Sequence, residues 1–150
     1  MEIMQEQSFE INNLITQSGK FKVKEFQESL NKLVNRYKAF SKTNGDYIIT
    51  TTKSIEIING EQIMEVEILM PVNYLIPVDE PYIFKSKLKL THALHTKVTD
   101  IAKLQDTLDM VNNYILEQKL EPITSAYLVQ IKEENQPNIE IYVGINPNII

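Results

Sequence analysis

The sequence has no cysteine and no tryptophan among its 150 residues, and only four glycines. The absence of cysteine excludes disulfide frameworks, cysteine-ligated zinc, iron–sulfur clusters and thiolate catalysis. Arginine is scarce as well, because Arg36 is the single arginine among fifteen basic residues. One guanidinium cannot form the clusters that read base edges or clamp phosphates. Together with the net charge of −5, this scarcity predicts no direct nucleic-acid partner.

Long hydrophobic runs are also missing. No apolar stretch approaches the roughly 18 residues of a membrane helix, and the N-terminal MEIMQEQSFE lacks the basic and apolar regions of a signal peptide. We therefore expect a cytoplasmic protein with no membrane partner. A length of 150 residues with 43% hydrophobic and 23% charged residues is typical of one globular domain. The sequence thus predicts a single domain over residues 1–150.

Two segments carry the apolar spacing of an amphipathic helix, residues 22–40 and residues 101–118. Asp100 precedes the second segment and is a predicted N-cap. The two apolar stripes superpose at one constant shift along the chain. The matched positions are Val23 with Ile101, Phe26 with Leu104, Leu30 with Leu108, Leu33 with Val111, and Tyr37 with Ile115.

Predicted strands flank both helices in the same order, which indicates an internal duplication. The first repeat covers about 6–72, a proline-rich connector covers 73–83, and the second repeat covers about 84–146. The alternative is that amphipathic helices and strands resemble one another generically. A three-stranded unit leaves open edges, so two units joined edge to edge predict an α+β fold. We expect an antiparallel sheet of about six strands, both helices on one face, and a groove at the seam.

Each repeat ends in a strand with a glutamate among β-branched residues, Glu67 in the first and Glu140 in the second. One interpretation is a solvated sheet face. The other is a pocket in which a desolvated carboxylate selects a cation or acts as acid or base. Tyrosines could supply flat apolar walls for an organic ligand, or simply belong to the core. The predicted ligand-binding residues are Glu140, Tyr127 and Tyr142 from the second repeat, with Glu67 and Tyr47 from the first.

This prediction depends on the register of the last hairpin. Tyr127 and Glu140 share a face only in some registers, because a shift of one residue turns every side chain to the other face. The intervening EENQPN is too long for its turn type to fix the pairing.

Other chemistry has little support in the sequence. His92 and His95 are three residues apart on a predicted strand and face opposite sides, so they cannot chelate one metal together. Neither histidine is next to a serine nucleophile, and no glycine-rich phosphate loop is present. We therefore predict no metal, no cofactor and no assigned catalytic residue.

The duplicated pattern resembles the GyrI-like superfamily of small-molecule-binding domains, which also serve as effector-binding modules of AraC-type and multidrug-sensing regulators. The resemblance is carried by ALHTKVTDIAKLQDTLDMVNNYILEQKLEP at 93–122, by the strands ITSAYLVQI and IEIYVGIN, and by MEVEILMPV at 64–72. It implies that Tyr127 is a strand aromatic, that Glu140 is the ligand-facing acid, and that Glu67 is its counterpart.

Three functions are compatible with this resemblance. The first is a stand-alone module that senses or sequesters a hydrophobic small molecule, including a cationic one. Because the duplication accounts for nearly all 150 residues, we expect no helix-turn-helix among them, and such a module would act through another protein or by buffering its ligand. The second is a protein-interaction or accessory module, which binds a protein partner or a second copy of itself. The third is a hydrolase of strained alkylating natural products, with Glu140 as general base and Tyr127 as its hydrogen-bonding partner.

Overall fold

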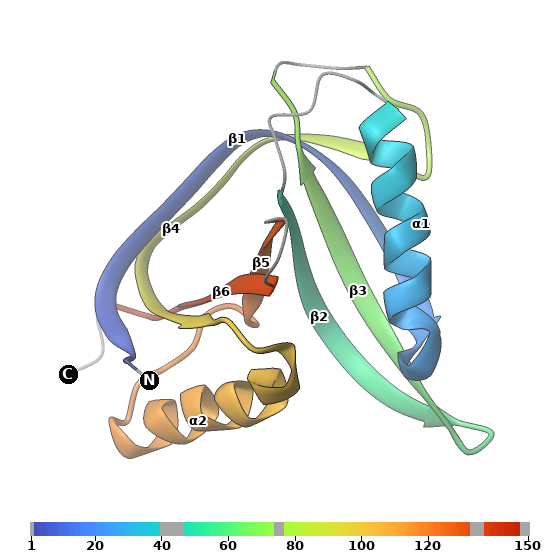
Figure 1. Ribbon diagram of the computed structural model, residues 1–150. Coiled ribbons are helices and arrows are strands. Elements are labelled where there is room, and N and C mark those ends of the chain that lie inside the picture. The colour runs from blue at the N-terminus through green and yellow to red at the C-terminus, as the bar shows by residue number, and fades with distance from the viewer. Residues whose placement is uncertain (1, 40–46, 74–76, 133–136, 148–150) are drawn as a thin grey trace. The chain divides into compact units, whose positions relative to one another are not determined.

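Six antiparallel strands and two helices form the chain in a computed structural model, which describes residues 2–39, 47–73, 77–132 and 137–147 (Figure 1). The predicted α+β class with a six-stranded antiparallel sheet is confirmed. The elements in chain order are β1 (Met4–Lys22), a 3₁₀ turn η1 (Val23–Glu25), α1 (Phe26–Ala39), β2 (Tyr47–Ile58), β3 (Glu61–Pro71), β4 (Ile83–Val98), a second 3₁₀ turn η2 (Ile101–Lys103), α2 (Leu104–Glu117), β5 (Tyr127–Lys132) and β6 (Pro137–Gly144).

The chain divides into two compact units. The central unit is Ile11–Leu88, and the terminal unit combines Met1–Glu10 with Lys89–Ile150. Because the divisions fall inside β1 and β4, both of these long strands contribute residues to each unit. The same order of strand, helix, strand and strand occurs twice along the chain. The duplication and the single-domain organisation over 1–150 stay predictions.

In the central unit, β3 pairs with both β1 and β2. Val66, Ile68 and Met70 alternate along β3 and are buried together with Leu30 of α1. This packing explains why the stripe of α1 is apolar, since burial of that face stabilises the helix. The β2–β3 hairpin turns at Asn59-Gly60, where both residues have positive φ, the conformation of a type I′ turn.

In the terminal unit, β6 pairs with both β4 and β5. Val111 and Ile115 of α2 are buried with Leu94 of β4 and Val143 of β6. A second cluster joins Val98, Ile139 and Ile141 to the partly buried Leu104 and Leu108. The side of this sheet that faces α2 is therefore apolar along the length of the helix.

Both helices begin later than their apolar stripes predict. Val23 and Ile101, the first residues of the two stripes, lie in 3₁₀ turns and are 38% and 53% exposed. The expectation that they belong to the buried stripe is wrong, because three residues per turn rotate them out of the α-helical face. The predicted cap is confirmed, since the Asp100 carboxylate accepts a hydrogen bond from the Ala102 N–H at 3.0 Å. Leu33 lies outside the described side chains, whereas Val111 is buried as predicted.

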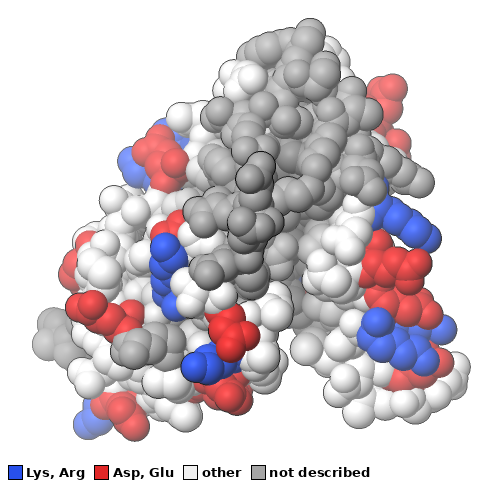
Figure 2. All heavy atoms as spheres, viewed as in Figure 1, with Lys and Arg blue, Asp and Glu red and all other residues white. Residues whose placement is uncertain are grey.

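Charged side chains of both signs are interspersed on the surface that Figure 2 shows, with red acidic groups directly beside blue basic ones. Two ion pairs illustrate this mixing, Lys22 with Glu61 at 3.1 Å and Lys32 with Glu28 at 3.8 Å. Neither described helix is long and apolar enough to cross a membrane.

Candidate ligand-binding face

The candidate site lies on the face of the terminal sheet that points away from α2. Ile139, Ile141 and Val143 are buried in the clusters that include α2 residues. Side chains alternate along a strand, so Glu140 and Tyr142 project from the opposite face. Both are partly exposed. The alternating sequence of β6 thus gives the strand a buried face and a partly exposed face.

The register of the last hairpin brings three predicted site residues onto one face. Tyr127 of β5 lies directly opposite Tyr142 of β6, and Val129 lies opposite Glu140. Directly opposed residues in an antiparallel pair project from the same face. Tyr127, Tyr142 and Glu140 therefore share one face, which is the arrangement that the predicted site required.

Two residues that the sequence did not place in the site complete this face. His95 of β4 lies opposite Tyr142, and its ring stacks on the tyrosine with 4.5 Å between centroids and 19° between planes. Phe9 of β1 contacts the same tyrosine at 4.5 Å and 31°. Tyr142 is thus in contact with two other rings. We call the set Phe9, His95, Tyr127, Glu140 and Tyr142 the aromatic face.

The Glu140 carboxylate lies at the margin of these rings. Its Oε1 is 3.2 Å from Nε2 of His95, and the two side chains are 26% and 18% exposed, respectively. Burial raises the pKa of the Tyr142 hydroxyl above its ordinary value of 10.0, and the negative charge of Glu140 raises it further. The phenol is therefore neutral and able to donate a hydrogen bond at physiological pH.

A surface groove of about 780 Å³ runs beside His95 in the same unit. Its lining includes Met4, Val98 and Met110, with charged groups among them. The groove and the aromatic face share His95. Solvent and solutes can therefore reach the imidazole from the groove.

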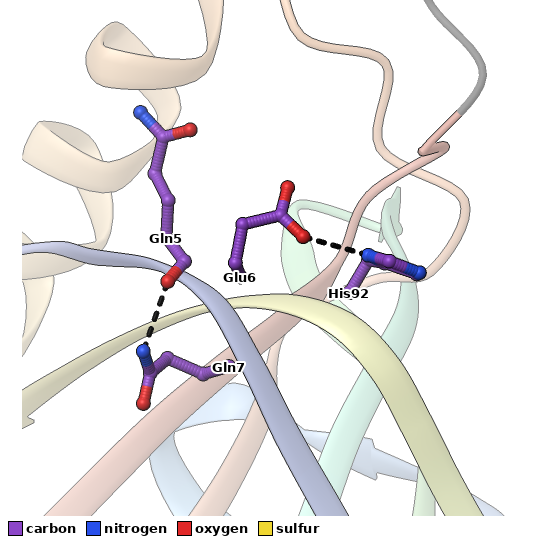
Figure 3. Close-up of polar contacts among 4 residues, drawn as sticks. All are labelled: Gln5, Glu6, Gln7 and His92. Carbon is purple, nitrogen blue, oxygen red and sulfur yellow. Dashed lines mark hydrogen bonds and ion pairs between the residues drawn. The ribbon is translucent and has the colours of Figure 1, made fainter.

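The second histidine of β4 makes a separate contact. Nδ1 of His92 is 2.7 Å from Oε2 of Glu6, as the dashed line in Figure 3 shows. Gln7 in the same segment donates a hydrogen bond to the backbone carbonyl of Gln5 at 2.9 Å (Figure 3). The two histidines therefore have different glutamate partners, consistent with the prediction that they face opposite sides. Within the described ranges, no three His, Asp or Glu side chains are grouped so that they could hold a metal ion.

The two predicted residues from the first repeat belong to the central unit. Val66, Ile68 and Met70 are buried with Leu30 of α1, so Glu67 projects from the face that points away from that helix. There it lies opposite Ser18 of β1 and Thr51 of β2. The side chain of Tyr47 lies outside the described residues. The contribution of Glu67 and Tyr47 to one ligand site stays a prediction.

His95 and Phe9 could not be found by spacing along the sequence. Phe9 comes from the other end of the chain, and His95 meets Glu140 only because β4 pairs with β6 in this register. One signal in the sequence was the alternation of β4. It places His95 on the same face as Ala93 and Lys97, and it places His92 on the opposite face.

Neither a protein-family model nor a curated protein matches this sequence. Solved structures do match. The C-terminal domain of EcmrR is similar over 97% of this chain and 99% of that domain, with a TM-score of 0.69 at 15% identity. The chain has the GyrI-like fold. The resemblance seen in the strand and helix pattern is therefore confirmed at the level of fold.

Two further solved structures show where this GyrI-like fold occurs. One is EcmrR in complex with DNA, with a TM-score of 0.67 at 15% identity, and the match covers 96% of this chain but 57% of that one. The other is described as a hydrolase from Listeria innocua, with a TM-score of 0.51 at 9% identity over 97% of this chain and 91% of that one. At these identities the likeness is one of fold.

Proposed function

We propose that the chain binds a flat, hydrophobic small molecule that carries a positive charge, and that the aromatic face is its binding surface. The observation that carries the proposal is the position of Glu140 beside three aromatic rings, with about a quarter of its side chain exposed. Rings of tyrosine and phenylalanine stack on planar molecules and attract cations to their faces. The carboxylate adds a direct charge partner for such a cation.

The biological role we propose is to sense or sequester this molecule. The likeness to the C-terminal domain of a DNA-bound regulator supports a sensing role. With a single arginine and a net charge of −5, these 150 residues are poorly suited to bind nucleic acid themselves. In a sensing role these residues would therefore act through another domain or another protein, whereas sequestration requires neither.

Binding of two planar fluorophores tests the proposal. Ethidium has a permanent positive charge, and 1-pyrenemethanol is neutral. We expect wild type to bind ethidium at pH 8.0, and Glu140→Gln to weaken that binding roughly tenfold, or about 1.4 kcal/mol, since a partly exposed charge pair is screened by solvent. Binding of 1-pyrenemethanol should change little. Glu117→Gln, an exposed glutamate on α2, is the matched control and should behave as wild type.

Two outcomes contradict the proposal. Equal binding of both dyes to wild type and Glu140→Gln rules out a charge-selective site. No binding of ethidium to wild type, followed by no thermal shift in a screen of planar cations, favours the protein-interaction function instead. The variant Glu67→Gln added to the same titration tests the predicted contribution of the first repeat.

Hydrolysis of a strained alkylating compound is a second candidate, favoured by two observations. Tyr127 and Tyr142 lie opposite each other next to Glu140, and a protein of similar fold is described as a hydrolase. In this reaction Glu140 would take a proton from water while the water oxygen attacks a carbon of the strained ring, and a tyrosine hydroxyl would donate a proton to the carbon that leaves. Mass spectrometry of a cyclopropane-bearing alkylating agent incubated with wild type and Glu140→Gln tests this. Equal rates of ring opening with both proteins and with buffer would exclude it.

A further inference from the structure

We propose that His95 is the specificity-determining residue of the aromatic face, and that its protonation switches the face from cation-binding to indifferent toward charge. This inference rests on the proposed function. It concerns one contact, between Nε2 of His95 and Oε1 of Glu140 at 3.2 Å. The neutral imidazole leaves the carboxylate as a net negative charge, whereas the imidazolium cancels it.

The imidazole is held in this position from two directions. Its ring stacks on Tyr142, and its nitrogen contacts Glu140. Rotation away from the carboxylate would break the stacking as well as the polar contact. Because both side chains are largely buried, at 18% and 26% exposure, the pair is less screened by solvent than an ordinary surface pair. The charge of His95 therefore acts directly on whatever binds Glu140.

The other charged groups near His95 include both acids and lysines, so neither sign of charge dominates. From β6 it faces Glu140 and the ring of Tyr142, and on β5 Tyr127 lies opposite that tyrosine. On β4 itself, Lys97 lies opposite Glu140. The charged groups that line the adjoining groove are Glu2, Lys97, Asp100, Lys103 and Asp106. Three acids and two lysines largely offset one another, which leaves Glu140 as the partner at contact distance.

The chemistry of histidine makes the switch operate near neutral pH. Histidine is the side chain whose charge ordinarily changes in the physiological pH range, and it gains a proton as the pH falls. At pH 8.0 the neutral ring donates its Nε2 hydrogen to Glu140, and the carboxylate retains its charge for a cationic ligand. When the ring is protonated, the imidazolium offsets the charge of Glu140 at 3.2 Å, so the face no longer attracts a cation. A neutral ligand experiences neither effect.

His92 is a matched control within the same strand. It also contacts a glutamate, Glu6, at 2.7 Å, and Figure 3 shows this pair. Alternation along β4 turns it to the face opposite His95. Its protonation should therefore leave ligand affinity unchanged, although the two histidines have the same chemistry.

Titration of ethidium at pH 8.0 and pH 6.0 tests the inference. We expect the dissociation constant of wild type to be several-fold higher at pH 6.0 than at pH 8.0, because protonation of His95 offsets the charge of Glu140. His95→Gln, which keeps a hydrogen-bond donor but does not titrate, should show the same affinity at both pH values. His92→Gln should keep the wild-type change with pH. Binding of 1-pyrenemethanol should not depend on pH in any of the three proteins.

A second measurement does not depend on the folding of the variant. Calorimetry of ethidium binding to wild type at pH 6.5, in two buffers with different heats of ionisation, should show net release of protons. Ethidium binding with no pH dependence and no proton release overturns the role of His95 and leaves the proposed function standing. A His95→Gln protein that folds and keeps the wild-type pH dependence, or a His92→Gln protein that loses it, also overturns this role. No binding of ethidium at pH 8.0 overturns both proposals.

Discussion

Val111 lies on the side of α2 that packs against the terminal sheet, and it is 3% exposed. It belongs to a buried cluster with Leu94 and Val143. Val111→Ala removes two carbons from this cluster and leaves a cavity. We expect the free energy of unfolding to fall by about 1–3 kcal/mol in denaturant titrations. Its neighbour Met110 is 47% exposed, so Met110→Ala is the control and should change stability by less than about 0.5 kcal/mol. Equal losses for both variants would contradict the orientation of α2.

Tyr142 should be the tyrosine whose ionisation reports on Glu140. Burial and then the carboxylate raise its pKa above 10.0. Glu140→Gln removes the second cause only, so we expect the Tyr142 pKa to fall part of the way back. Absorbance of tyrosinate near 295 nm, compared with a Tyr142→Phe protein to isolate its contribution, provides the measurement. An unchanged titration in Glu140→Gln would contradict the proximity of the two groups.

The raised pKa of Tyr142 also makes the free energy of unfolding depend on pH in the alkaline range. In the folded chain Tyr142 holds its proton to a higher pH than it does in the unfolded chain. Its contribution to stability is therefore complete below about pH 10 and is lost as the pH rises through the folded-state pKa. Tyr142→Phe should show a smaller loss of stability than wild type over that alkaline range.

Spacing along the sequence identified individual core residues better than individual site residues. Leu30, Val111 and Ile115 are buried as their helical spacing predicts. A helical stripe depends on neighbours three and four positions away, which a sequence displays directly. His95 and Phe9 reach the aromatic face through strand pairing, which a sequence displays only after the register is known.

At the scale of the element, the start of η2 depends on Asp100. Its carboxylate accepts a hydrogen bond from the backbone of Ala102 and satisfies one of the free N–H groups at the beginning of a helix. Asp100→Ala should lower the free energy of unfolding by about 1 kcal/mol. Asp100→Ser keeps an acceptor and should lose less. Chemical denaturation of the three proteins decides this, and equal losses in both variants would exclude a capping role.

The β2–β3 hairpin depends on the backbone conformation of Gly60. Its φ is 79°, and no described atom lies within 4 Å of the position where a Cβ would be added. Gly60→Ala therefore has no steric contact to make, and its cost comes from the left-handed conformation alone, about 1 kcal/mol in thermal or chemical denaturation. Gly60→Asn should cost less, because asparagine adopts this conformation more readily. An alanine variant as stable as wild type would contradict the turn.

The extent of the strands was harder to predict than their existence. The first repeat is predicted to begin at about residue 6 and its helix at residue 22, whereas β1 alone extends from Met4 to Lys22. Glu6 and Asn13 have positive φ within it, and such irregularities interrupt the alternation on which the prediction depends. The last hairpin was ambiguous for a related reason, since its loop is too long to select one register.

At the scale of the whole molecule, the charge balance predicts how solubility depends on pH. The net charge of −5 at pH 7 reaches zero near pH 5.1. Proteins associate most readily where their net charge vanishes. We expect the concentration that remains in solution after centrifugation to be lowest near pH 5 and to rise toward pH 8. A minimum above pH 7 would contradict this expectation.

The terminal unit is assembled from both ends of the chain, and this has a consequence for the order of events during synthesis. Residues 11–88 leave the ribosome as one continuous unit, whereas the first ten residues must wait for partners that follow residue 88. Phe9 is an example, because its contact Tyr142 is synthesised near the end of these 150 residues. Because β6 lies between β4 and β5, this sheet cannot form until residue 144 is available. Domains generally fold as units from the N-terminus onward, so nascent chains from which residues 11–88 have emerged, but β6 has not, should contain a structured central segment and no aromatic face.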